Sequence, residues 1–326
     1  MARHEPPAFA GPQRDFVGYS DAPPDFAWPD GSRLAVNIVI NYEEGSERSA
    51  FRGDTQRERL LEMQYDVADD ERELVAESAF EYGSRVGIWR ILALLTELEV
   101  PATIFACPDA LLQNPRVVPR LLAHGCDFVG HGSRWIQHYG LSVDHQRADV
   151  QCCIADLERL TGKKILGWFT RPPNTVATRE LLATEGLLYD SGAINDDLPY
   201  FDTVAGKPFL VVPYSLDVND TRFYKGQFFT GADFEVYARD AFDVLHRESR
   251  SHGRMMSIGL HPRIIGRPGR FGGLRRFLEH IVQRNDVWIA RRNDIAEFWA
   301  STFGSDETWN LPRRYSRVTY RRRPQH

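Results

Sequence analysis

Short apolar runs alternate with longer amphipathic segments along the chain from residue 33 onward. The apolar runs lie at 33–40, 102–106, 127–130, 165–169, 187–190, 209–213, 255–260 and 286–290. They are apolar on both faces, which is typical of parallel strands that are buried on each side. Seven or eight such strands separated by helical segments predict an α/β fold, and within that class a (β/α) barrel of seven or eight parallel strands.

The segments between these runs carry helical patterns. Residues 84–98 place four apolar side chains at the i, i+3, i+4 and i+7 spacing of an amphipathic helix. Asn114 followed by Pro115 is typical of a helix N-cap and first helical position, and that helix is expected to end near Gly125. Further helices are expected at 143–161, 176–185, 232–249, 272–284 and 293–302.

A single domain is expected at 33–303. Residues 1–32 are rich in proline and polar side chains and are expected to form an extended N-terminal arm. The charged stretch 46–83 is long for a loop in a compact domain, so we expect a lid or binding loop, or a surface excursion with some helix of its own. Residues 304–326 are expected to form a basic C-terminal tail.

The composition excludes several classes of protein. The chain has 326 residues, 26% of them charged, and no apolar run approaches the ~20 residues that span a bilayer. The N-terminus has no hydrophobic leader segment, so a cytoplasmic protein without a membrane partner is expected. Six arginines lie in residues 313–326, so the rest of the chain is more acidic than the net charge of −5, which argues against nucleic-acid binding. The four cysteines show no CxxC spacing, which fits a reducing compartment.

Polar side chains that can do chemistry recur directly after the predicted strands. They occur in Asn41-Tyr42-Glu43-Glu44-Gly45, His131-Gly132-Ser133-Arg134-Trp135, Thr170-Arg171-Pro172-Pro173-Asn174, Asp217-Val218-Asn219-Asp220 and His261-Pro262-Arg263. Because the carboxyl ends of the strands of a (β/α) barrel meet on one face, we expect these segments to converge on one pocket.

Carboxylate, imidazole and guanidinium groups in these segments suit hydrolysis. Adjacent residues of a strand point to opposite sides, so only one of Glu43 and Glu44 is expected to reach the pocket, unless a turn aims both. With such a carboxylate, His131 and His261 supply a base, an acid and an orienting group. Arg171 is suited to binding a carboxylate or stabilising an oxyanion. These residues also have non-catalytic alternatives: the glutamates could be solvated loop acids, the histidines could be packed in the core, and Arg171 could form a surface ion pair.

The order of these segments resembles the polysaccharide deacetylase superfamily, whose fold is a distorted (β/α) barrel. Finer matches resemble its branch of bacterial allantoinases and cyclic imidases. These matches lie at 81–90 (EYGSRVGIWR), 131–136 (HGSRWI), 195–200 (NDDLPY), 217–223 (DVNDTRF) and 257–268 (SIGLHPRIIGRP). The resemblance spans roughly residues 14 to 300 and implies a hydrolase that forms a homo-oligomer.

The resemblance also bears on a metal site. The superfamily places two acidic residues after the first strand, one as base and one as ligand, and two histidines four residues apart as further ligands; these positions are Glu43, Glu44, His131 and Trp135 here. An indole nitrogen donates only and cannot bind a cation. The resemblance therefore implies an enzyme that acts without a metal or other cofactor. The alternative is a zinc site formed by Glu44, His131 and His138.

The function predicted from this resemblance is hydrolysis of a non-peptide C–N amide bond in a small cyclic ureide or imide. Glu43 is the predicted general base and His261 the predicted general acid. The substrate-binding residues are predicted to be Glu44, His131, Trp135, Arg171, Asn219 and Asp220. The branch tends to carry glycines where this chain has Pro172 and Pro173, which leaves allantoin itself open as the substrate.

Two other functions stay open at this point. One is a metal-dependent N-deacetylase of an acetylated amino sugar, which requires zinc. The other is a barrel that binds a small ligand without turnover. Retention of an acid and two histidines at strand ends argues against the second alternative.

Overall fold

A computed structural model describes residues 12–60, 62 and 67–305 of the chain. The predicted C-terminal tail lies outside the described residues except for its first two positions, and the predicted N-terminal arm is described only from residue 12. Among the described helices, none is long and apolar enough to cross a membrane.

Within the described residues, nine strands form one curled sheet with the order β6-β7-β5-β4-β3-β2-β1-β8, and β9 also pairs with β1. All neighbours run parallel except β6 and β7, which are antiparallel. The strands are β1 (Leu34–Tyr42), β2 (Thr103–Ala106), β3 (Asp127–Gly130), β4 (Gly167–Trp168), β5 (Tyr189–Asp190), β6 (Tyr200–Val204), β7 (Lys207–Val211), β8 (Arg254–Leu260) and β9 (Val287–Ile289). The predicted α/β fold of the polysaccharide deacetylase type is confirmed, as a half-barrel.

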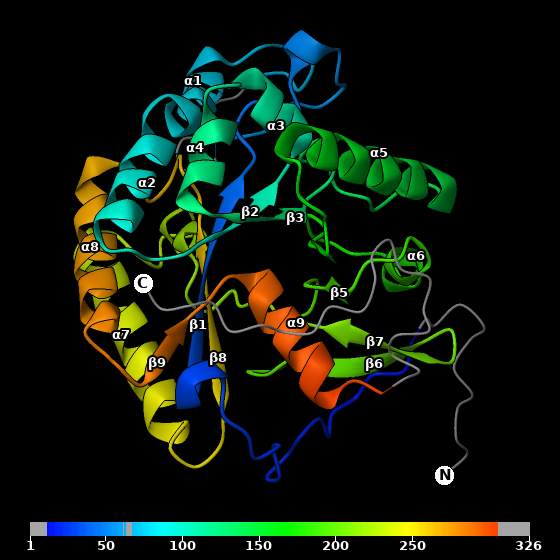
Figure 1. The fold of residues 1–326 in the computed structure, drawn as a ribbon. Coiled ribbons are helices and arrows are strands. Elements are labelled where there is room, and N and C mark those ends of the chain that lie inside the picture. The colour runs from blue at the N-terminus through cyan, green and yellow to red at the C-terminus, as the bar shows by residue number, and fades with distance from the viewer. Residues whose placement is uncertain (1–11, 61, 63–66, 306–326) are drawn as a thin grey trace, which may run out of the picture.

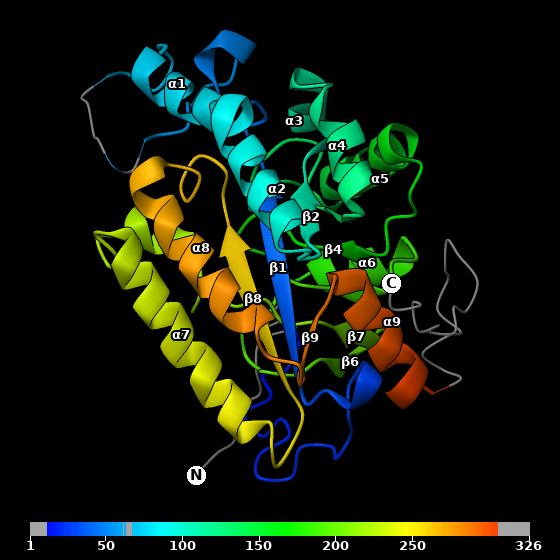
Figure 2. The same ribbon diagram turned by 60° about the vertical axis from the view of Figure 1, so that its left-hand side comes forward.

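Helices surround this sheet (Figures 1 and 2); most lie on its outer face, whereas the last one packs against the apolar cluster inside the half-barrel. They are α1 (Leu74–Tyr82), α2 (Ile88–Glu97), α3 (Pro108–Gln113), α4 (Val117–His124), α5 (Val143–Thr161), α6 (Thr178–Thr184), α7 (Gly231–Glu248), α8 (Pro268–Val282) and α9 (Arg292–Phe303). Figure 2 shows α7 and α8 side by side beyond β8. A π-helical turn, η3 (Gly83–Gly87), joins α1 to α2, so one long helical stretch follows the 46–73 excursion.

Three local predictions differ from the structure. Strand β6 was not predicted; it is short and half-exposed, so it lacks the buried apolar run of the parallel strands. Helix α4 begins at Val117, because the Asn114 amide donates to the backbone and hydroxyl oxygens of Ser84 instead of capping a helix. Helix α3 was not predicted, whereas α1 agrees with the expectation that the 46–83 stretch has some helix of its own.

The sheet is open on the far side of β8 because irregular segments lie where a further strand would close the barrel. The β8 residue Met255 donates its N–H to the Asp197 carbonyl at 2.9 Å. Farther along, Gly259 donates to the Val218 carbonyl at 2.9 Å and forms a parallel bridge with Asn219. These contacts satisfy the outer edge of β8 without a regular strand.

Alternating residues of β1 explain how the core and the site are separated. Leu34, Val36 and Ile38 belong to the apolar cluster beneath the outer helices, whereas Ala35 and Val39 belong to the cluster inside the half-barrel. Successive side chains of a strand point to opposite faces. The side chain that follows this inner row beyond the strand is Glu43, at the end toward which β1 points in Figure 1.

A fully buried arginine, Arg292, fills the interior of the half-barrel below that end. Its guanidinium donates five hydrogen bonds of 2.6–3.1 Å to uncharged oxygens, those of Ser191, Asn37, Ser257, Val212 and Pro213. Burial lowers the pKa of Arg292 to about 10, and the side chain stays protonated at neutral pH. Arg292 therefore ties β1 and β8 to the segments after β5 and β7.

Candidate active site

Glu43 lies at the centre of a buried polar cluster at the carboxyl ends of the strands. Its Oε1 lies 3.2 Å from His131 Nε2 and 3.6 Å from His261 Nε2, and its Oε2 lies 2.7 Å from Arg263 Nη2. These four side chains are between 1% and 7% exposed. The structure thus brings together residues that follow β1, β3 and β8, as the sequence predicts.

The orientation of His131 is fixed from behind. Its Nδ1 lies 2.6 Å from the Phe169 carbonyl oxygen, and because a carbonyl only accepts, Nδ1 must donate. Its ring also stacks on the Phe169 ring, with centroids 5.2 Å apart. Nε2 therefore points at Glu43, and that nitrogen is available to donate to a negatively charged oxygen whenever it carries a proton.

A carboxylate stands behind His261. The Asp220 Oδ1 accepts from His261 Nδ1 at 2.6 Å, while Oδ2 accepts the backbone N–H groups of His261 and Ile265 at 2.7 and 3.2 Å. Burial opposes protonation of His261, but the Asp220 and Glu43 carboxylates outweigh burial and raise its pKa above the ordinary value. Asp220 thus holds the Nδ1 side of the His261 ring, and Nε2 faces Glu43.

The two adjacent glutamates are pushed toward different protonation behaviour. Burial favours the neutral form of both; at Glu43 the Arg263 guanidinium and the two imidazoles outweigh it and hold the pKa well below its usual range. At Glu44, burial and the charge of Glu43 outweigh Arg263 and raise the pKa. A pair of carboxyl groups with separated pKa values is typical of acid–base sites.

Glu44 contacts both the backbone and the side chain of Arg263. Its Oε1 accepts the Arg263 backbone N–H at 3.1 Å and lies 3.5 Å from Nη1 of the same residue. A Cβ on Gly83 would lie only 2.4 Å from this Oε1, so the glycine is required for the π-helical turn to approach the glutamate. In this structure Glu44 contacts Arg263, and its predicted substrate-binding role stays a prediction.

Arg171 lies beside the cluster and pairs with the 46–73 excursion. Its two terminal nitrogens each donate to a Glu58 carboxylate oxygen at 2.8 Å, and its guanidinium stacks 3.6 Å from the centroid of Trp135. Trp135 also lies 4.9 Å from the Arg263 guanidinium. The predicted substrate-binding roles of Arg171 and Trp135 stay predictions, because Glu58 engages the donors of Arg171 in this structure.

Further ion pairs hold the excursion across the ends of the strands, at the top of Figure 1. Arg134 binds Asp54 through two hydrogen bonds of 3.0 and 2.6 Å. Two more pairs join the excursion to α3 and α8; they are Arg52–Asp109 and Arg270–Glu62. The backbone N–H of Trp135 donates to the Ser46 carbonyl at 3.1 Å. This placement agrees with the interpretation of the excursion as a lid.

Asn219 and Asp220 are buried, and their side chains are engaged by neighbouring groups of the protein, so their predicted substrate-binding roles stay predictions. Both Asp220 oxygens are engaged as described above. The Asn219 Oδ1 accepts from the backbone and hydroxyl of Thr221, and its Nδ2 donates to the Tyr214 hydroxyl at 3.1 Å. Asn219 thus caps the short helix η4 (Asp220–Phe223), which presents Asp220 to His261.

Comparison with known proteins agrees with this geometry. Residues 69–187 match the polysaccharide deacetylase family. A Schizosaccharomyces pombe protein named "Putative polysaccharide deacetylase" is 38% identical over 311 residues, which cover 88% of this chain and 97% of the relative. The chain belongs to the polysaccharide deacetylase family. It is a hydrolase of that family.

Two solved structures with the polysaccharide deacetylase fold are similar over most of their length. The crystal structure of PuuE allantoinase is 42% identical, with a TM-score of 0.85 over 90% of this chain and 98% of the other. A structure named "probable Polysaccharide deacetylase" from Pseudomonas aeruginosa PAO1 is also 42% identical, with a TM-score of 0.85 over 90% and 99% of the two chains.

The metal site of polysaccharide deacetylases does not fit the donor set of this chain. Glu43 and Glu44 both face the Arg263 guanidinium, and the ring at the second histidine position is Trp135. The alternative ligand His138 binds Asp149 through Nε2 at 2.8 Å. Within the part of the chain that the structure describes, no group of three or more His, Cys, Asp and Glu side chains is arranged to hold an ion.

The sequence analysis gave Arg263 no role. The residue stands two positions after His261, inside a segment that the sequence analysis singles out. Its reach to Glu43 depends on the turn after β8, in which Ile264 donates its N–H to the His261 carbonyl at 2.9 Å. Spacing along the chain does not reveal such a contact.

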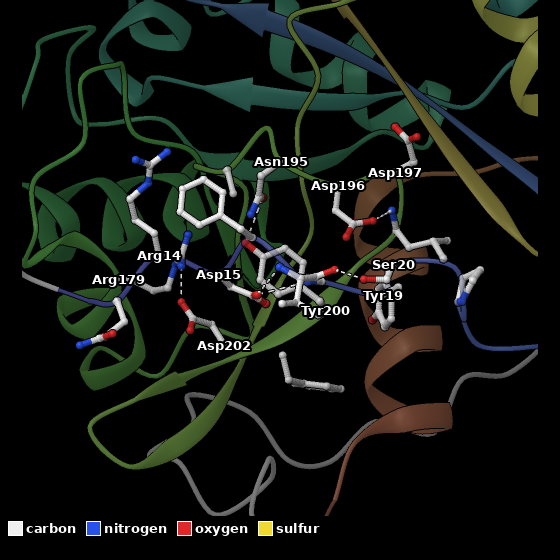
Figure 3. Close-up of a pocket in the computed structure, with 18 of the residues that line it drawn as sticks. Arg14, Asp15, Tyr19, Ser20, Arg179, Asn195, Asp196, Asp197, Tyr200 and Asp202 are labelled. Atoms are coloured by element: carbon white, nitrogen blue, oxygen red, sulfur yellow. Dashed lines mark hydrogen bonds and ion pairs between the residues drawn. The ribbon is translucent and has the colours of Figure 1, made fainter. Parts of the chain in front are cut away.

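A cavity of ≈ 850 Å³ lies elsewhere, between the N-terminal arm and the 193–202 segment (Figure 3). Arg179 lines this cavity and forms ion pairs with Asp190 and Asp202. The Tyr19 hydroxyl donates a hydrogen bond of 2.7 Å to the Pro199 carbonyl. Its lining residues include none of the cluster around Glu43. This cavity therefore plays no part in the site described above.

Proposed function

We propose that this chain hydrolyses a C–N amide bond of a small cyclic ureide or imide and opens its ring. The observation that carries the proposal is the Glu43 carboxylate flanked by the Nε2 atoms of His131 and His261, with Asp220 behind His261. Similarity to PuuE allantoinase, at 42% identity over 90% of the chain, supports an allantoinase-like reaction.

Each group has a chemical role in this mechanism. Glu43 Oε1 accepts a proton from a water molecule, whose oxygen attacks the ring carbonyl carbon. The C–N bond then breaks, and His261 Nε2–H gives its proton to the leaving nitrogen. The product carries a new carboxyl group and a new N–H on the same molecule. Asp220 fixes the tautomer of His261 through Nδ1.

The developing oxyanion needs hydrogen-bond donors at the same place. His131 Nε2 lies on the Glu43 side of the site, opposite the bond that Nδ1 makes to Phe169. A protonated Nε2 beside a water-excluded carbonyl stabilises negative charge there by a few kcal/mol, as a single oxyanion donor does in other hydrolases (about 3 kcal/mol). His131 is therefore proposed to bind the carbonyl that is attacked.

Enclosure of the site supports a small substrate. Glu43, His131 and His261 are 1%, 1% and 6% exposed, and the excursion is fastened over them by ion pairs. A residue inside a long polymer needs an open groove along the surface, whereas a small ring is able to be enclosed completely. Enclosure therefore favours a cyclic amide over an acetylated polysaccharide.

A substrate panel tests this proposal. The protein is treated with a chelator, and the chelator is then removed. The treated protein is incubated with cyclic ureides, cyclic imides and N-acetylated amino sugars. We expect ring opening of at least one cyclic amide, measured as carboxylate release, and no acetate release from the sugars. Acetate release that depends on added zinc would favour a deacetylase instead. Absence of turnover on every compound would favour a ligand-binding barrel.

Asp220→Asn is expected to shift the pH profile of ring opening. The folded pKa of His261 is raised above its ordinary value, so the acid form of His261 is present at low pH and is lost as pH rises through that raised pKa. Removing the Asp220 charge lowers the pKa of His261. The alkaline limb of kcat against pH should move to lower pH, which is measured with the best substrate of the panel.

The matched control is Asp149→Asn, which removes the carboxylate behind His138 instead. It should leave the alkaline limb in place. If the two variants moved that limb equally, Asp220 would have no special influence on the acid.

A further inference from the structure

The Arg263 guanidinium contacts both glutamates of the site, and the mechanism above gives it no role. Its side chain is 4% exposed and its two terminal nitrogens face both glutamates, at 2.7 Å from Glu43 Oε2 and 3.5 Å from Glu44 Oε1. Its backbone N–H also binds Glu44 Oε1 at 3.1 Å. Arg263 is thus the group between the two adjacent carboxylates.

Aromatic rings complete the surroundings of this guanidinium. Its central carbon lies 4.7 Å from the centroid of Phe80 and 4.9 Å from that of Trp135. A cation over an aromatic face is stabilised by the ring quadrupole, and the effect is larger when water is excluded. The guanidinium is therefore held by charge on one side and by rings on the other.

We propose that the Arg263 guanidinium is the resident cation of this site and occupies the position in which Glu43, Glu44 and His131 would otherwise bind a divalent ion. The inference rests on the proposed function only for the role of Glu43 as base. Arg263 is a positioning residue: it holds Glu43 Oε2 so that Oε1 points at the two imidazoles, and it neutralises the second carboxylate.

Geometry favours this role over that of a simple buried ion pair. A buried pair needs one partner for each charge, whereas Arg263 is shared between two carboxylates whose backbone positions are adjacent. Two negative charges so close together are energetically unfavourable unless a cation lies between them. Trp135 replaces the remaining ligand position with a ring that stabilises a guanidinium and cannot bind a metal.

The proposal predicts that removing Arg263 creates a metal site. We expect the wild-type protein, dialysed against Co²⁺ and then against metal-free buffer, to retain less than about 0.1 ion per chain. Arg263→Ala should retain close to one Co²⁺, because it frees two carboxylates beside His131, whose Nε2 lies 3.2 Å from Glu43 Oε1. Three protein ligands are the arrangement of many catalytic metal sites. Adding Glu44→Gln to Arg263→Ala should abolish that retention.

Two further variants keep the test decisive. Arg267→Ala removes an arginine of the same loop that stacks on Tyr82, and it should retain no Co²⁺. Arg263→Lys keeps a cation between the carboxylates and should also retain none, so it provides the readout if Arg263→Ala does not fold by circular dichroism. Added guanidinium ion should raise the ring-opening kcat of Arg263→Ala at least tenfold, with little change in KM.

The outcomes separate this inference from the proposed function. Stoichiometric Co²⁺ in the wild type or in Arg263→Lys would overturn the inference while leaving ring opening testable by the substrate panel. A folded Arg263→Ala that retains no Co²⁺ would also overturn it. If the metal results hold but no cyclic amide is opened, Arg263 is still the resident cation and the proposed reaction is wrong.

Discussion

Replacing Glu43 by glutamine is expected to lower kcat for ring opening by about a thousandfold, within the range that a general base contributes. The glutamine side chain has nearly the same shape, but its amide cannot accept the proton of the attacking water. It also replaces a carboxylate that two imidazoles and Arg263 surround. The measurement is the steady-state rate on the best cyclic substrate.

A glutamate far from the site provides the control for this substitution. Glu279→Gln on α8 changes a half-buried residue whose carboxylate lies 3.4 Å from Arg275, and it should leave kcat unchanged. Equal rates for wild type and Glu43→Gln would remove Glu43 from the mechanism. The thermal unfolding of both variants should be measured as well, so that a loss of activity is not mistaken for a loss of fold.

Arg292→Ala is expected to destabilise the fold by about 3–5 kcal/mol, because it leaves buried acceptors without donors and opens a cavity. The five oxygens that the guanidinium satisfies come from four parts of the sheet interior. Water has little access to replace those donors, since Arg292 is fully buried. The free energy of unfolding is measured by urea denaturation at neutral pH.

A half-buried arginine on an outer helix supplies the comparison. Arg275→Ala on α8 breaks an ion pair with Glu97 at the surface and should change the free energy of unfolding by less than about 1 kcal/mol. Arg292→Lys keeps the charge with fewer donors and should fall between the two. A fully stable Arg292→Ala would mean that the interior rearranges to satisfy the five oxygens.

The sequence predicted the parallel strands well because their signal is local. The run 127–130 and the helix 143–161 coincide with β3 and α5, since burial on both faces and a capped amphipathic pattern are both visible in neighbouring residues. Strand β6 has no such pattern, because it lies at the edge of the sheet, where β7 is its only partner strand among the described residues. Its formation depends on the partner strand rather than on its own composition.

For the site, the sequence located the segments but not all the contacts. Strand-end placement correctly brings Glu43, His131 and His261 together. It assigned Asp220 to the substrate, although the turn after β8 turns two backbone N–H groups toward that carboxylate. It gave no role to Arg263 for the same reason: the side-chain directions around this turn are set by tertiary packing.

The pairing of β1 with β8 has a consequence for how activity is lost. Ile40 lies opposite Leu260 in this ladder, and Glu43 and His261 follow within three residues on either strand. A shift of one residue would turn every side chain of β8 to the other face and separate acid from base. Heat should therefore inactivate the enzyme only as β1 and β8 separate. The backbone amides of β1 should exchange with deuterium no faster than activity is lost.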